Sequence, residues 1–355
     1  MSIFHQKPFR PFPGLAGGLR QTCVGAYLPF PTHTRLQSQR HTVTLRDGDR
    51  VVVHETLREK NDRFDSNTSV LLVHGLAGSH QSGYMHRMAI KLQDQHIPCW
   101  RLDLRGCGDG VHLAQQSLHA GRSPDIDDVV RALIEKAPCQ SWIVAGFSLG
   151  GNIVLKWLGE QHANLPEQVI GGIAVAPPID LLACSRHISS PRQRLYDRAF
   201  ARWMNRHVDR RAPQNPSLTR LAATGPRPRS LWGFDSKFTA PLGGFASVED
   251  YYTQSSSAPH LAHIDVPTLI LAAEDDPLIP SRIYAEHQIS ATIQLVTTAH
   301  GGHLGYIGVR GTDPDCRWMD WRLVDWIQTH ARIQTHARPQ TCHTSVHPTA
   351  SARCD

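Results

Sequence analysis

Six short apolar runs that alternate with helical patterns constrain the fold of this chain more than any other feature. The runs are SVLLVHG (69–75), IPCWRLDL (97–104), WIVAGF (142–147), VIGGIAVAP (169–177), PTLILAAE (267–274) and TIQLVTTA (292–299). Continuous apolar runs of this length are typical of parallel strands that are buried on both faces. Because each run is followed by a segment with helical periodicity, we predict an α/β fold with a mostly parallel central sheet and helices on both faces.

A hairpin is predicted ahead of these runs. Residues 41–45 and 50–56 alternate as strands do, and they flank Asp47-Gly48-Asp49, which is a strong turn signal. Residues 1–40 are rich in proline and glycine, and we expect them to form an irregular arm that lies on the domain.

One interval interrupts the alternation of strands and helices. The segment between Asp180 and Pro267 is several times longer than a usual connection, so we predict a structured insertion there. Residues 190–211 within it predict an amphipathic helix, whose apolar side would carry Leu195, Ala199, Trp203 and Met204. Arginines also recur at every fourth position of this helix: Arg194, Arg198, Arg202, Arg206 and Arg210. We interpret this stripe as a solvated helix face. The alternative is that it attracts an anionic substrate or makes a weak contact with a membrane surface.

Composition excludes several classes of protein. The net charge of +6 is too diffuse to indicate a nucleic-acid partner. The eight cysteines include no CxxC pair, which argues against a disulfide scaffold or a structural zinc site, and we expect reduced thiols. The N-terminus has no apolar run typical of a signal peptide, and no segment approaches the ~20 apolar residues of a transmembrane helix. We therefore expect a cytoplasmic protein.

The C-terminal end carries IQTHAR twice, at 327–332 and 333–338. Two copies are too few to build a solenoid, so we expect a local duplication that extends the last helix, followed by a flexible tail.

The stretch AGFSLGG places Ser148 between Gly146 and Gly150, where the run 142–147 ends and a helical pattern begins. This is the strand–turn–helix context that a nucleophile elbow requires. A sharp turn strains the serine backbone, and a side chain at either glycine would collide with the neighbouring strand or helix. Ser148 is therefore the candidate nucleophile.

A serine hydroxyl is a poor nucleophile without a base. The segment after the last run supplies His303 and His300, and we prefer His303 because the two glycines before it let the loop turn its imidazole. The segment after the preceding run supplies Asp276, which begins a proline-fixed turn, with Asp275 and Asp180 as alternatives. The order Ser148, Asp276, His303 is the one found in α/β-hydrolases.

Two backbone N–H groups are needed to stabilise the negative oxygen that develops during attack on a carbonyl. We assign one to Leu149, directly after the nucleophile, and the other to Leu76 in the segment HGLAGS (74–79). His74 and Gly75 are expected to shape that turn, with His74 as a hydrogen-bonded structural residue.

Several motifs in one order give the chain a family resemblance. They are HGLAGS, RLDLRGCGDG (101–110), LHAGRSPDI (118–126), GFSLGGNI, GGFASVEDYY (243–252), DVPTLILAAEDDP (265–277) and HGGHLGYIG (300–308). With them the chain resembles the α/β-hydrolase superfamily over roughly residues 40–330, and within it the YheT-like esterase branch, which is related to eukaryotic acylglycerol and phospholipid hydrolases. The resemblance implies a serine hydrolase of carboxylic esters with Ser148, Asp276 and His303 as its triad. It also implies that the insertion is a cap over the site.

Other parts of the matched motifs are expected to serve structure. We interpret Asp103, Arg105 and Cys107 as parts of a strand-end turn that organises the loops beneath the site.

The expected organisation is an N-terminal arm (1–40), a hydrolase core in two parts (41–182 and 259–330), a helical cap (183–258) and a flexible tail (331–355). The expected activity is cleavage of short- to medium-chain acyl esters or acylglycerol-like lipids through an acyl-enzyme, with no metal or organic cofactor. Aromatic residues of the insertion hint at an apolar substrate: Trp203, Trp232, Phe234, Phe238 and Phe245. Two alternatives stay open, namely acyl transfer to an alcohol and a non-catalytic scaffold.

Overall fold

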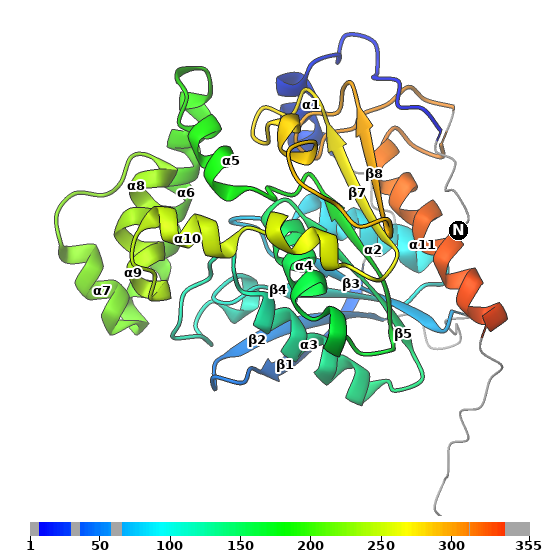
Figure 1. Ribbon diagram of the computed structural model, residues 1–355, viewed down its shortest axis with the longest axis horizontal. Helices are drawn as coiled ribbons and strands as arrows, with labels where there is room; N and C mark the ends of the chain where they lie inside the picture. The colour runs from blue at the N-terminus through cyan, green and yellow to red at the C-terminus, as the bar shows by residue number, and fades with distance from the viewer. Residues whose placement is uncertain (1–6, 30–35, 58–65, 312, 338–355) are drawn as a thin grey trace, which may run out of the picture.

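In the part of the chain that the structure describes, eight strands form one sheet in the order β1-β2-β4-β3-β5-β6-β7-β8 (Figure 1). The computed structural model describes residues 7–29, 36–57, 66–311 and 313–337. The strands are β1 (Gln37–Thr44), β2 (Arg50–Leu57), β3 (Thr68–Val73), β4 (Cys99–Asp103), β5 (Ser141–Phe147), β6 (Val169–Val175), β7 (Thr268–Ala273) and β8 (Ile293–Thr298). All six apolar runs and both arms of the hairpin are thus confirmed as strands.

The sheet is parallel except at one edge. β1 pairs antiparallel with β2, and β2 pairs antiparallel with β4, whereas the pairs from β4 to β8 are parallel. The hairpin turns at Gly48, whose φ of 86° is accessible to glycine at little cost. Parallel strands end at the same edge of a sheet, so the loops after β3, β5, β7 and β8 meet there.

Helices cover both faces of the sheet (Figure 1). Val70 and Leu72 of β3 point to the face covered by α2 (Gly83–Asp94) and α11 (Trp318–Ala337). Leu71 and Val73 point to the opposite face, which α3 (Ser123–Lys136) and α4 (Leu149–Glu160) cover. Successive side chains of a strand face opposite ways, so burial on both faces requires an unbroken apolar run.

The chain between β6 and β7 folds into helices that lie to one side of the sheet, drawn in green and yellow at the left of Figure 1. They are α5 (Leu181–Ile188), α6 (Arg194–Arg211), α7 (Pro216–Ala223), α8 (Leu231–Phe234), α9 (Ala240–Gly243) and α10 (Val248–Ser255). Asp180, Asn215 and Ser247 cap α5, α7 and α10 by accepting hydrogen bonds from backbone N–H groups. A small apolar core of Val208, Leu218, Phe234 and Phe238 holds the outer helices together. The inserted helical cap is therefore present.

Helix α6 confirms the helix predicted in the insertion, but the apolar side predicted for it is only partly right: Met204 packs on the cap core, whereas Leu195 and Trp203 face outward. Leu195 is 80% exposed and Trp203 is 44% exposed, whereas Ala201 and Val208 are buried. Polar contacts rotate the helix away from the orientation that hydrophobicity alone predicts. Asp197 accepts a hydrogen bond from the Leu231 N–H (2.6 Å), and buried Arg211 donates to two carbonyl groups of the 114–116 loop. The five arginines of the stripe are exposed, as a solvated face requires.

The N-terminal arm also differs from the prediction. It contains α1 (Gly18–Tyr27), and β1 already begins at Gln37. At the other end, α11 continues to Ala337 and includes the first IQTHAR copy and most of the second, while residues 338–355 of the predicted tail lie outside the described residues. None of the helices in the described ranges has the length and apolarity needed to cross a membrane. Five described cysteines are free thiols, but Cys139 is disulfide-bonded, so the expectation of reduced thiols is wrong for that residue.

Candidate active site

Ser148 lies in a strained turn between β5 and α4. Its φ of 51° and ψ of −119° are unfavourable for a residue with a side chain. The turn is held by the Ser148 N–H, which donates to the Val175 carbonyl (2.8 Å). A Cβ at Gly146 would lie 2.3 Å from the Gly150 carbonyl oxygen, and one at Gly150 would lie 2.5 Å from the Val73 carbonyl oxygen. Both glycines are therefore sterically required for the predicted elbow.

His303 connects Ser148 to Asp276. The distance from its Nε2 to the Ser148 Oγ is 3.0 Å, and the distance from its Nδ1 to the Asp276 Oδ2 is 2.8 Å. The side chain of His303 is 11% exposed and that of Asp276 is 2% exposed. The three residues thus form a continuous hydrogen-bonded chain that begins at the elbow and ends at a buried carboxylate.

Local backbone geometry orients the Asp276 carboxylate. Its Oδ1 accepts hydrogen bonds from the N–H groups of Leu278 (2.8 Å) and Ile279 (3.1 Å). These bonds engage one oxygen in the turn that follows β7 and leave Oδ2 directed at His303. Asp276 is therefore held in place by the proline turn that marks it in the sequence.

The alternative acids and the alternative base do not join this chain. Asp275 accepts hydrogen bonds from the His300 Nδ1 (3.1 Å) and the Gly302 N–H (2.9 Å). Asp180 caps α5 instead. The turns after β7 and β8 therefore form two carboxylate–histidine pairs, Asp275–His300 and Asp276–His303. Of these two pairs, only Asp276–His303 contacts Ser148.

Helix α1 supports the histidine loop (residues 301–306), and we did not predict this contact from the sequence. The His303 N–H donates to the Thr22 Oγ (2.8 Å), and the Thr22 hydroxyl donates to the Gly18 carbonyl (2.7 Å). A Cβ at Gly18 would lie 1.6 Å from the Asp275 carbonyl oxygen, and one at Gly25 would lie 2.5 Å from the Gly305 Cα. The small residues Gly18, Thr22 and Gly25 recur at helical spacing, and this signal could have revealed a helix that packs closely.

The predicted oxyanion loop is fixed by polar contacts. The His74 Nε2 accepts a hydrogen bond from the Leu104 N–H (3.1 Å), while its Nδ1 lies 2.7 Å from the Gly75 carbonyl and donates to it. These contacts require the neutral imidazole, and burial also lowers the pKa of His74. The Gly75 N–H donates to the Tyr84 hydroxyl (2.9 Å). His74 therefore has the predicted structural role.

The turn after β4 organises the loops beneath the site, as predicted. The Arg105 guanidinium, 1% exposed, binds Asp125 at 2.7 Å and Asp49 at 2.5 Å. Asp103 accepts a hydrogen bond from the His80 N–H (2.7 Å). Burial raises the pKa of the Cys107 thiol to about 12, so this cysteine is not a reactive thiolate at neutral pH.

An apolar cavity opens onto Ser148 between the core and the insertion. Leu76 and Leu149, the predicted oxyanion donors, line it together with Ser148 and His303. Leu149 is the first residue of α4, where a helix leaves backbone N–H groups without an intrahelical partner. The two leucines remain predicted donors.

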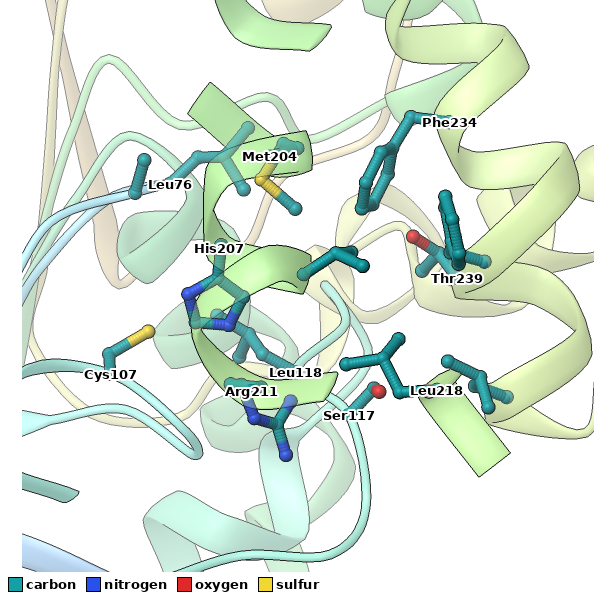
Figure 2. Close-up of a pocket in the computed structure, with 14 residues that line it drawn as sticks. Leu76, Cys107, Ser117, Leu118, Met204, His207, Arg211, Leu218, Phe234 and Thr239 are labelled. Carbon is teal, nitrogen blue, oxygen red and sulfur yellow. The ribbon is translucent and has the colours of Figure 1, made fainter. Parts of the chain in front are cut away.

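A second hollow adjoins this cavity (Figure 2). The two spaces share Leu76, Leu118, Met204 and Thr239 in their walls. Burial lowers the pKa of His119, in the wall of the first cavity, to about 3 and that of His207, in the wall of the second, to about 4. Both imidazoles are therefore neutral at physiological pH, which keeps the surface apolar in character.

The chain is similar to several hydrolases. It is 29% identical over 267 residues to "Putative esterase YheT" of Escherichia coli (strain K12), covering 74% of this chain and 76% of that protein. It is 25% identical over 247 residues to "Phospholipase ABHD3" of Homo sapiens, covering 67% of this chain and 58% of that protein. Among solved structures, the esterase Pf2001 of Pyrococcus furiosus superposes with a TM-score of 0.53 at 14% identity, covering 94% of this chain and 99% of that one. That structural likeness shows a common fold.

A family model described as the alpha/beta hydrolase fold matches residues 68–308. The match runs from β3 through the cap to the histidine loop. The esterase-type relatives support a hydrolase activity for this chain. The chain therefore belongs to the alpha/beta hydrolase fold family.

Proposed function

We propose that this protein is a serine esterase that cleaves carboxylic esters with apolar acyl chains, such as short- to medium-chain acyl esters or acylglycerol-like lipids. The observation that carries the proposal is the hydrogen-bonded chain Ser148–His303–Asp276 at the mouth of an apolar cavity. The chemistry follows from the roles that such a chain allows.

The Ser148 Oγ attacks the ester carbonyl carbon while the His303 Nε2 accepts the serine proton. Asp276 orients the imidazole and stabilises its positive charge. The N–H groups of Leu76 and Leu149 stabilise the oxyanion. His303 then protonates the leaving alcohol, and an acyl group stays bonded to Ser148. A water molecule that gives its proton to His303 attacks this acyl-enzyme and releases the carboxylic acid.

The cavity walls support an apolar acyl group as the part of the substrate that is bound. Around Ser148 the walls are formed by side chains such as Leu181, Ile188 and Leu278. Burial of a methylene group contributes about 0.8 kcal/mol, so a chain that extends from Ser148 toward Met204 and the second hollow gains binding energy with each carbon that it buries.

A p-nitrophenyl ester series from acetate to laurate tests this proposal, with wild type beside Ser148→Ala. We expect the wild type to hydrolyse the series with a preference for chains longer than acetate, and Ser148→Ala to lose the turnover. Adding an alcohol acceptor and analysing the products distinguishes hydrolysis from acyl transfer, because transfer yields a new ester in place of the acid. A folded wild type without turnover of any ester would overturn the proposal and favour a scaffold.

A further inference from the structure

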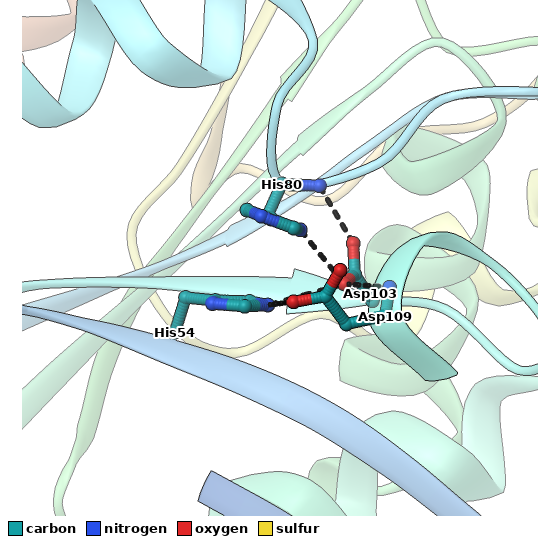
Figure 3. A group of neighbouring side chains, drawn as sticks. All are labelled: His54, His80, Asp103 and Asp109. Atoms are coloured by element: carbon teal, nitrogen blue, oxygen red, sulfur yellow. Dashed lines mark hydrogen bonds and ion pairs between the residues drawn. The ribbon is translucent and has the colours of Figure 1, made fainter. Parts of the chain in front are cut away.

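A cluster of two histidines and two aspartates lies apart from the Ser148 site (Figure 3). His54 comes from β2, His80 from the loop between β3 and α2, Asp103 from the last position of β4, and Asp109 from the short turn that follows. Figure 3 shows all four side chains converging from these segments on one point. His54, His80 and Asp103 are buried, and the side chain of Asp109 is 45% exposed.

The donor atoms have the separations of a metal coordination sphere. The His80 Nδ1 lies 2.8 Å and the His54 Nε2 lies 3.2 Å from the Asp103 Oδ2, and the His54 Nε2 lies 3.5 Å from the Asp109 Oδ2. One ligand atom from each residue lies within 4.8 Å of the others. Ligands in a tetrahedral zinc site are about 3.3 Å apart, since each lies about 2.0–2.1 Å from the ion. The three contacts given above bracket this value, and all the separations lie within 4.8 Å.

The ring arrangement is crowded for hydrogen bonding alone. The two imidazoles stack with centroids 3.5 Å apart at an angle of 18°, and a nitrogen of each points at the same Asp103 oxygen. That oxygen also accepts the Asp109 N–H at 2.9 Å. Three N–H groups that donate to one oxygen bring their partial positive charges close together. A cation that replaces the two imidazole protons would instead be bound by the lone pairs of both ring nitrogens and of both carboxylates.

The surroundings fix the Asp103 carboxylate as outer partners fix metal ligands. Its Oδ1 accepts the His80 N–H at 2.7 Å. Gly108 has a φ of 50°, and a Cβ there would lie 2.2 Å from the Asp103 carboxyl group, so glycine makes room for the Asp109 turn to approach. The cluster offers two imidazole nitrogens and two carboxylates, and the combined charge of the two carboxylates is one that a divalent cation neutralises.

We propose that His54, His80, Asp103 and Asp109 hold a divalent first-row transition metal ion, for which Zn²⁺ has the preferred ligand chemistry. The exposed side of Asp109 provides the entry path for the ion. The ion joins β2, the β4 turn and the loop that carries Leu76, so its role is structural. This site departs from our expectation from the sequence that no metal is held, because its ligands lie far apart in the chain. The inference of a metal site does not depend on the proposed ester hydrolysis.

Zinc titration of the full-length protein, stripped with a chelator and monitored with a competing chromogenic chelator, tests the site. The variants are His54→Gln, Asp109→Asn and the control His41→Gln. His41 pairs with Glu55 on the neighbouring strands and lies outside the cluster, so the control measures binding by other histidines. We expect one tight equivalent in wild type and His41→Gln, and at least tenfold weaker binding in both ligand variants.

Two further readouts separate a built site from adventitious binding. X-ray absorption of the one-equivalent zinc complex should show only nitrogen and oxygen ligands, including two imidazoles. Zinc should raise the melting temperature of wild type and His41→Gln but not of the ligand variants. Absence of a saturable site in wild type would overturn the proposal, as would affinity within threefold of wild type in either ligand variant. Circular dichroism checks that each variant folds. If His54→Gln does not fold, Asp109→Asn alone decides the test, because a substitution at the partly exposed Asp109 is expected to leave the fold intact.

Discussion

Asp275 and Asp276 are neighbours in the chain, yet their carboxylates serve different histidines. Asp276 binds the imidazole that contacts Ser148, whereas Asp275 binds His300 and the Gly302 N–H. The first pair has a role in proton transfer in our account, and the second pair supports the loop. The two residues therefore form a matched pair for mutagenesis.

Asp276→Asn is expected to lower kcat/KM for a p-nitrophenyl ester by about 10³–10⁴-fold, because an amide cannot stabilise the imidazolium or hold the productive tautomer. Asp275→Asn, the matched control, is expected to stay within about tenfold of wild type, since it only loosens the loop. Steady-state kinetics on folded variants checks both values. Equal losses in the two variants would contradict the assignment of Asp276.

The stability of the cap is expected to depend on pH through Asp235. It is buried, and its carboxylate accepts hydrogen bonds from the Tyr252 hydroxyl (2.7 Å) and the Thr239 hydroxyl (2.5 Å). Burial raises the pKa of Asp235 from its ordinary value of 3.8 to about 6. Between these two values the folded protein binds the proton that the unfolded chain releases. The stabilisation by this proton is thus complete below about pH 4 and is lost as the pH rises through about 6.

Asp235→Asn should therefore raise the free energy of unfolding at pH 8 relative to wild type, by up to about 3 kcal/mol, and the difference should shrink toward pH 4. Asp209→Asn, at an exposed position of the cap, should show no such trend. Urea unfolding at both pH values measures the difference. A wild type that gains stability relative to Asp235→Asn as the pH rises would contradict this sign.

Helix α1 shows how an element can support a site without entering it. It contacts the histidine loop through Gly18 and Gly25, where glycine permits backbone contact, and through the Thr22 hydroxyl. Strands and elbow could be predicted from the sequence, because their signals are local: unbroken apolar runs, and a serine between glycines. The docking of α1 could not, because it depends on the loop of residues 301–306, which lies at the far end of the chain.

Gly25→Ala is expected to lower kcat by about 10- to 100-fold and stability by about 1–3 kcal/mol, because the added methyl group displaces α1 from Gly305. Leu19→Ala, on the exposed side of α1, should leave both quantities near wild type. Ester kinetics together with thermal unfolding test the prediction. Unchanged kcat in Gly25→Ala would show that the loop does not need α1.

At the scale of the whole molecule, the site exists only where the core and the insertion meet. Ser148 and His303 come from the core, while Phe200 and Met204 come from α6 and close the same cavity. The sequence indicated that an insertion exists and that it is helical. It indicated Met204 as an inward residue of α6 but not that Leu195 and Trp203 face outward, because Asp197 and Arg211 fix the helix through hydrogen bonds that a hydrophobic pattern does not record.

Met204→Trp places a larger side chain where the two hollows share a wall. We expect kcat/KM for laurate esters to fall about tenfold or more while that for acetate esters stays near wild type, since only long chains reach this position. Trp203→Ala, at the exposed neighbouring position, is the control and should not alter the chain-length profile. A uniform loss across the series in Met204→Trp would mean that the acyl chain binds elsewhere.

The most direct test of the central claim is covalent labelling with a fluorophosphonate, read by intact mass and peptide mapping. We predict a single adduct on the Ser148 peptide, absent in Ser148→Ala and formed much more slowly in His303→Ala. A folded wild type that takes up no adduct, or an adduct that persists in Ser148→Ala, would contradict it.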